Sequence, residues 1–163
     1  IIPIADNLAQ GNRTVTLAIA ADFALVRDAG QSAAITIQDK PFDSWRFVNF
    51  SNSELTTPAI SSETADPDGD NLANLLEYAL ALDPNLASIS PVTTDSSGGY
   101  LTVASPKSTA ATDILWAAQV TDDLKTWQTV VPTLNTASDF AASDTVSSNS
   151  AMKRFIRLKI TRP

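Results

Sequence analysis

The carboxylates best placed to do chemistry in this chain lie together in one short segment. Asp66, Asp68 and Asp70 occupy alternate positions, and Glu77 follows in the apolar stretch after them. A loop with carboxylates at every second position can turn them toward one point, and a calcium ion requires about six to eight such oxygens. Because three aspartates this close repel one another, their spacing favours a bound cation. The alternative is a helix-capping turn without an ion, in which Asp and Asn are also common.

The spacing fits the calcium-loop pattern with Asp at the first position, Asp or Asn at the third and fifth, and Glu at the twelfth. In that pattern the backbone carbonyl of Leu72 and the side chain of Asn74 also bind, and Glu77 closes the site with both oxygens. Asn71 replaces the pattern's Gly, where a left-handed backbone is needed, and Asn tolerates that conformation. Asp83 either adds a ligand or caps a turn. The predicted ligands of one Ca²⁺ are Asp66, Asp68, Asp70, Leu72, Asn74 and Glu77.

The composition argues against several classes of partner. The chain has 163 residues, is 44% apolar and carries a net charge of -7, from 18 acidic and 11 basic residues. An acidic chain without a basic cluster argues against nucleic acid and against an anionic membrane surface. No apolar run approaches the about 18 residues of a membrane-spanning helix, so membrane insertion is not expected.

Catalysis is not expected in this chain. It has no His and no Cys, which removes the commonest general base, the thiol nucleophile and every Ser-His-Asp triad. The adjacent Asp122 and Asp123 fall between two expected strands and fit a turn. Trp116, Trp127 and Tyr100 could form a sugar-binding platform, but packing in a core is the favoured interpretation.

The chain divides by composition into three parts, residues 1–40, 41–90 and 91–163. In the first part, alternating apolar and polar residues predict strands at 13–20 and 33–39, with a short strand at 1–4 before them. Two or three strands bury too little surface to be stable alone. We therefore expect them to pair with strands from the preceding part of the same polypeptide or from a cleaved partner chain.

The middle part is predicted to be a helical connector, and the last part a β-domain. Leu72 to Leu80 form an apolar stripe of helical period, which Pro84 ends. Strands are expected at residues 98–105, 113–121, 127–131 and 154–161. Residues 135–151 are polar and small, with little periodicity, and are expected to form a loop.

Three motifs resemble known families. The segment after Ala65 resembles the calcium loops of dockerins and thrombospondin type 3 repeats. With "WRF" at Trp45 to Phe47 before it and "RFIRLKI" at Arg154 to Ile160 at the end, residues 41–163 look like the C-terminal region of large secreted proteins of planctomycete- and verrucomicrobium-type bacteria. The strands at Gly11 to Leu17 and Ala34 to Asp39 are similar to the C-terminal half of a Calx-beta domain.

The resemblance and the residues together give one expectation. The fold is mainly β, with β-sandwich portions joined by a short helical connector that carries one EF-hand-like calcium loop. The resemblance implies a non-catalytic, calcium-stabilised region of a larger secreted or cell-surface bacterial protein. The alternatives are a glycan- or surface-binding module, or an accessory chain of a secreted polysaccharide-degrading hydrolase or lyase.

Overall fold

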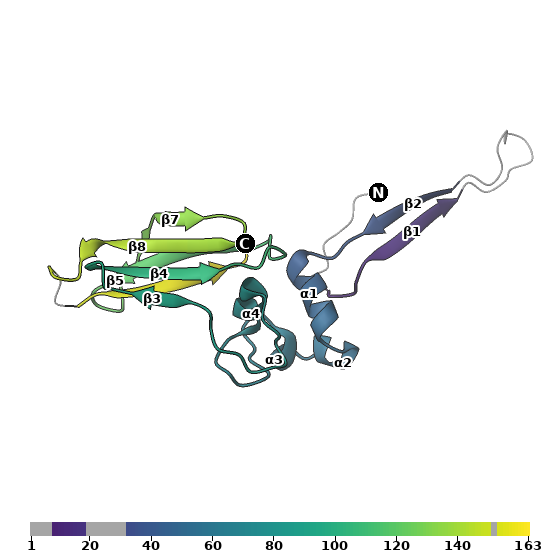
Figure 1. The fold of residues 1–163 in the computed structure, drawn as a ribbon. Coiled ribbons are helices and arrows are strands. Elements are labelled where there is room, and N and C mark those ends of the chain that lie inside the picture. The colour runs from purple at the N-terminus through teal and green to yellow at the C-terminus, as the bar shows by residue number, and fades with distance from the viewer. Residues whose placement is uncertain (1–7, 19–31, 151–152) are drawn as a thin grey trace, which may run out of the picture.

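The computed structural model describes residues 8–18, 32–150 and 153–163. The fold is mainly β, with several antiparallel sheets and short helices between them, as the sequence predicts. A hairpin, a group of helices and a larger β-domain follow one another along the molecule (Figure 1). The strand expected at residues 1–4 lies outside the described residues. No helix in the described part of the chain is long and apolar enough to cross a membrane.

The N-terminal hairpin extends away from the rest of the chain (Figure 1). Its strands β1 (Arg13–Ala18) and β2 (Ser32–Ile37) pair antiparallel and form a two-stranded sheet. Val15 lies opposite Ile35. Val15, Leu17 and Ile35 are 37%, 48% and 39% exposed, so the apolar side chains of this hairpin remain uncovered in the described structure.

The C-terminal part is a sandwich of two antiparallel sheets. One sheet has the strand order β3-β4-β8-β7 and the other β6-β5-β9. Their facing sides bury one core cluster, to which both sheets contribute. The strands are β3 (Thr93–Asp95), β4 (Tyr100–Pro106), β5 (Leu115–Thr121), β6 (Gln128–Val130), β7 (Pro132–Asn135), β8 (Asp139–Ser147) and β9 (Phe155–Thr161). The buried core residues are Val103, Ala118, Val120, Val130, Phe140 and Ala142.

The expectation of a loop at residues 135–151 is wrong, because most of that segment forms β8, which lies between two strands of the larger sheet. Its inward positions hold Phe140, Ala142 and Asp144, which are all buried. The alternation is hard to see in the sequence because one inward residue is small and one is charged. Asp144 is tolerated in the interior since Arg154 donates two hydrogen bonds of 2.7 Å to its carboxylate.

The connector consists of α1 (Pro41–Asn49), the one-turn helices α2 (Asn52–Leu55) and α3 (Pro58–Ser61), and α4 (Asn74–Leu80). Helix α4 begins two residues later than the apolar stripe suggests, because the loop before it folds around the aspartates. It ends at Ala81, whose left-handed backbone (φ 58°) stops the helix before Pro84 is reached.

The connector packs against the sandwich through a core of its own. Phe42, Tyr78 and Ala111 are buried together, with Trp45 packed against them. The ring centroids of Phe42 and Trp45 lie 5.5 Å apart. The Ser108 amide donates to the carbonyl oxygen of α4 residue Ala79 at 2.7 Å. The helices and the sandwich therefore share one apolar contact.

Candidate metal site

The loop before α4 folds around its own aspartates. The two carboxylate oxygens of Asp66 accept hydrogen bonds from the amides of Gly69 and Asn71, both at 2.9 Å. Asp70 Oδ1 accepts from the Leu72 amide at 2.7 Å. Asn71 has the left-handed backbone (φ 72°) that its position in the calcium-loop pattern requires. Asn71 thus adopts the conformation for which the pattern ordinarily uses Gly.

The three aspartates converge. One carboxylate oxygen from each of Asp66, Asp68 and Asp70 lies within 4.8 Å of the other two, a grouping that could hold a metal ion. Asp68 Oδ2 is buried without a hydrogen-bond partner. Burial raises the pKa of Asp68, and the charges of Asp70 and Asp66 raise it further. These side chains form a strongly negative cluster at one end of α4.

Glu77 is the most unusual residue of the site. It lies in α4, its side chain is fully buried, and neither carboxylate oxygen has a hydrogen-bond partner. Burial raises its pKa to about 7, and the charges of Asp68, Asp70 and Asp66 add to the effect. Buried carboxylates are ordinarily hydrogen-bonded or paired with a cation. Glu77 therefore lacks the partner that its burial calls for.

Asn74 has one unused acceptor. It is fully buried, and its Nδ2 donates to the carbonyls of Ile60 and Ser62, both at 2.8 Å. Its backbone amide donates to the carbonyl of Ala65 at 2.8 Å. Its Oδ1 has no partner. The side-chain oxygen of a predicted ligand is thus free, while the amide group holds the preceding segment in place.

Leu72 and Asp83 are the two remaining residues considered as ligands, and both have local backbone hydrogen bonds. Leu72 is half-buried in the loop, with its amide bonded to Asp70. Asp83 is exposed and accepts from the Asn85 amide at 3.0 Å, as a turn-capping residue does, although its charge contributes to the raised pKa of Glu77. The structure thus brings the three aspartates together, while the roles of Leu72, Asn74 and Glu77 as ligands stay predictions.

The other residues considered as sites have structural partners. Asp123 accepts from the amides of Lys125 and Thr126, both at 2.7 Å, which lowers its pKa to about 2 and fits the expected turn. The ring of Trp116 lies 5.8 Å from that of Phe140 in the core.

The two remaining aromatic candidates, Trp127 and Tyr100, have different surroundings. The guanidinium of Arg157 lies 3.8 Å from the ring centroid of Trp127 and covers one face of that ring. Tyr100 is 44% exposed at the start of β4.

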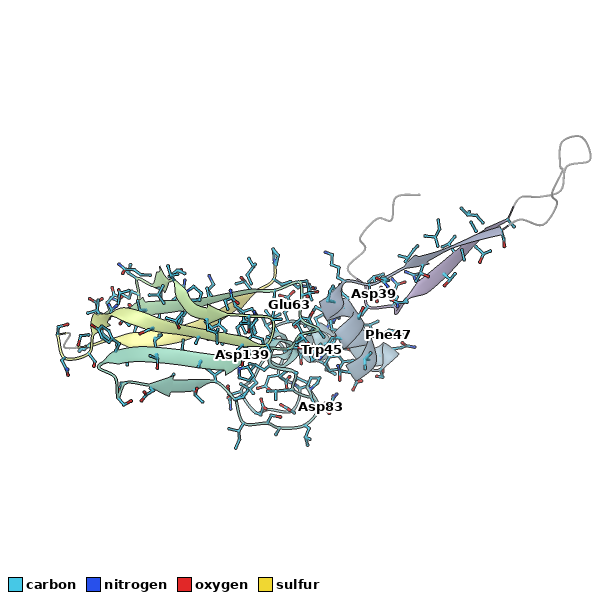
Figure 2. The ribbon with its side chains drawn as sticks, turned by 45° about the horizontal axis from the view of Figure 1, so that its top comes forward. Asp39, Trp45, Phe47, Glu63, Asp83 and Asp139 are labelled. Atoms are coloured by element: carbon cyan, nitrogen blue, oxygen red, sulfur yellow. The ribbon has the colours of Figure 1, made fainter. Side chains whose placement is uncertain are left out.

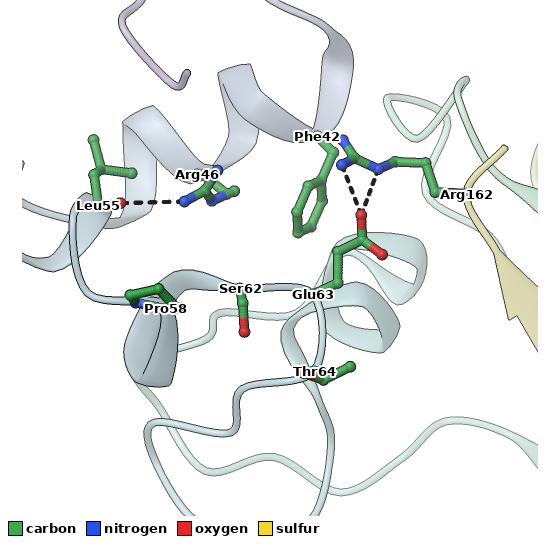
Figure 3. A pocket seen from close by; sticks show the side chains of 8 residues that line it. All are labelled: Phe42, Arg46, Leu55, Pro58, Ser62, Glu63, Thr64 and Arg162. Carbon is green, nitrogen blue, oxygen red and sulfur yellow. Dashed lines mark hydrogen bonds and ion pairs between the residues drawn. The ribbon is translucent and has the colours of Figure 1, made fainter. Parts of the chain in front are cut away.

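An ion-pair network beside the site could not be predicted from the sequence. Arg162 Nε and Nη2 lie 2.7 and 2.6 Å from Glu63 Oε1, across 99 residues of sequence. This pair borders a cavity of about 360 Å³ between α1 and α3, where Arg46 donates to the Leu55 carbonyl at 3.3 Å (Figure 3). Such long-range pairs have no local spacing pattern, so only the fold reveals them.

Comparison with known protein families, with curated proteins and with solved structures found no match to the chain. The site must therefore be interpreted from its own geometry.

Proposed function

We propose that the chain binds one Ca²⁺ ion and that the ion has a structural role. The observation that carries the proposal is Glu77, a fully buried carboxylate without a hydrogen-bond partner, beside three convergent aspartates. A cation between them would supply the missing partner and offset the repulsion among the four charges. The proposed ligands are Asp66, Asp68, Asp70, the Leu72 carbonyl, Asn74 and Glu77.

Calcium fits this set of groups better than magnesium does. All the proposed ligands are oxygens, and together they can supply six or more contacts when one carboxylate binds with both oxygens. Magnesium requires near-ideal octahedral geometry and keeps several waters. A soft transition metal would favour His or Cys ligands, and the chain has neither.

The ion would stabilise the connector that joins the N-terminal hairpin to the C-terminal sandwich. Asp70 Oδ2 accepts from the amide of Ser88, in the segment that leads to β3, at 2.7 Å. At the other end, Asp39 Oδ2 accepts from the amides of Gln10 and Gly11 at 2.7 and 2.8 Å. Figure 2 places Asp39 where the hairpin meets α1, the helix that carries Phe47. The calcium loop and this junction would together hold the hairpin and the sandwich to one rigid connector.

We further propose that the chain is a non-catalytic part of a larger secreted or cell-surface bacterial protein. The absence of His and Cys supports this proposal, as does the resemblance of the loop and the final strand. Among the described residues the hairpin has two strands and leaves Val15 and Leu17 exposed, which supports a partner that adds strands to it. That partner would be another part of the polypeptide or a separate chain. A glycan-binding role receives less support, because Arg157 covers a face of Trp127.

Thermal unfolding tests the calcium proposal. The chain should unfold at a higher temperature with calcium than with a chelator. Magnesium at the same concentration should raise the unfolding temperature by less. An ion at a hundredfold excess over its dissociation constant stabilises the fold by about 2.7 kcal/mol if it binds only the folded state. Equal unfolding temperatures in calcium and in chelator would contradict the proposal.

A further inference from the structure

We propose that Arg162, far from the loop in sequence, is a positioning residue for the calcium site. This inference rests on the proposed function. Arg162 follows β9 and donates to Glu63 Oε1 through Nε at 2.7 Å, while its Nη2 lies 2.6 Å from the same oxygen. Its guanidinium also lies 4.8 Å from the ring centroid of Phe42. These contacts fix the segment that contains Glu63 against the sandwich (Figure 3).

The segment around Glu63 in turn sets the start of α4. The Glu63 carbonyl accepts from the Leu75 amide at 3.1 Å, and the Ala65 carbonyl accepts from the Asn74 amide at 2.8 Å. The Asn74 side chain donates to the carbonyl of Ser62 at 2.8 Å. A shift of this segment would therefore move Asn74 directly. It would also move the helix turn that carries Glu77.

A second set of contacts links Arg162 to α4 through Asp113 and Tyr78. Arg162 Nη1 lies 3.8 Å from Asp43 Oδ2 and 4.0 Å from Asp113 Oδ2. The hydroxyl of Tyr78 donates to Asp113 Oδ1 at 2.6 Å. Tyr78 is the neighbour of Glu77 in α4. The guanidinium thus faces carboxylates from three segments that together fix the orientation of this helix.

Arg154 offers a matched control at the other end of β9. It is an arginine in a comparable ion pair, with its Nη2 at 2.7 Å from Asp144 Oδ1, and 13% of its side chain is exposed against 20% for Arg162. Its partner Asp144 lies in β8 of the sandwich, and no hydrogen bond or ion pair among the described residues joins that carboxylate to the connector. Losing this pair should weaken the sandwich without reshaping the calcium loop.

Calorimetric titration of calcium into the full chain tests the inference. R162Q should bind calcium about 3- to 30-fold more weakly than the unchanged chain, the range typical of energetic coupling through packed contacts. R162K, which keeps a charge near Glu63, should recover part of the loss. R154Q should lower the unfolding temperature and leave the calcium affinity unchanged. Equal affinity of R162Q and the unchanged chain would overturn the inference and leave the calcium site standing.

The other outcomes are also decisive. If R162Q and R154Q weaken binding equally, Arg162 acts only through general stability and the inference fails. If the unchanged chain shows no calcium binding, the proposed function fails with it.

Hydrogen exchange on the unchanged chain covers the case in which R162Q does not fold. Because coupling is reciprocal, calcium should slow exchange at the amides of residues 160–162. Unchanged exchange there, alongside slower exchange in the loop, would overturn the inference.

Discussion

Replacing Glu77 with Gln should stabilise the metal-free fold and reduce the stabilisation that calcium provides. In the metal-free fold the Glu77 pKa is about 7, against an ordinary value of 4.5, because the carboxylate is buried beside other acids. Each pKa unit corresponds to about 1.4 kcal/mol, so keeping Glu77 ionised above pH 7 costs the fold about 3 kcal/mol. Because the folded pKa is raised, this cost is absent below pH 4.5 and grows as the pH rises toward 7. In chelator at pH 8, E77Q should therefore be more stable than the unchanged chain.

Calcium should remove most of that difference. At a calcium concentration about a hundredfold above the dissociation constant, the unchanged chain gains about 2.7 kcal/mol. If losing the closing carboxylate weakens binding about a hundredfold, E77Q gains only about 0.4 kcal/mol at the same concentration. For a chain of this size the difference amounts to about 5 to 10 °C in the calcium-induced shift of the unfolding temperature.

Thermal unfolding of both chains, in calcium and in chelator, measures these shifts. E54Q is a matched control, because Glu54 lies in the same connector and caps α2 through the Ser51 amide at 2.7 Å, away from the loop. Its calcium-induced shift should equal that of the unchanged chain. A full calcium-induced shift in E77Q would contradict the role of Glu77 as a ligand. Lower stability of E77Q than of the unchanged chain in chelator at pH 8 would contradict the cost of burying its charge.

Three further predictions concern the rest of the fold. G11A should loosen the hairpin, because Gly11 has φ +74° and an added Cβ would lie 2.8 Å from the Phe47 ring. Proteolysis of the hairpin should therefore be faster in G11A. An unchanged cleavage rate would contradict this prediction. F140A should destabilise the sandwich by about 3 to 5 kcal/mol in urea unfolding, since the ring is 1% exposed, and a loss below about 1 kcal/mol would contradict that core. Arg154 lowers the pKa of Asp144, so their pair should stabilise the fold above about pH 4 and lose its effect as the pH falls through the folded pKa. D144N should therefore be much less stable than the unchanged chain at pH 6 and less distinguishable from it at pH 2; an equal deficit at both values would contradict this assignment.

The strands with clear alternation could be predicted from the sequence. In β9, Ile156, Leu158 and Ile160 are half-buried while the residues between them are exposed, as the pattern indicates. The β8 strand could not be predicted, because its buried positions include Asp144, which is acceptable there because Arg154 in the next segment pairs with it. Local patterns thus identify strands with an apolar face and miss strands whose interior depends on an ion pair with another segment.

More of the loop than of its tertiary contacts could be predicted from the sequence. The spacing of Asp66, Asp68 and Asp70 predicted a group of carboxylates, and the structure confirms that they converge. The left-handed backbone of Asn71 also follows from the pattern. The contacts of Glu63 with Arg162 could not be predicted, because they depend on how the connector docks on the sandwich. Spacing determines which carboxylates converge, while tertiary packing determines how firmly the loop is held.

The most direct test of the calcium site is a crystal structure of the chain grown with calcium, with the ion located by its anomalous scattering. We expect one ion, with oxygens of Asp66, Asp68, Asp70 and Glu77 at about 2.3 to 2.6 Å from it. A loop without an anomalous peak, or a Glu77 carboxylate hydrogen-bonded to protein groups instead of the ion, would contradict it.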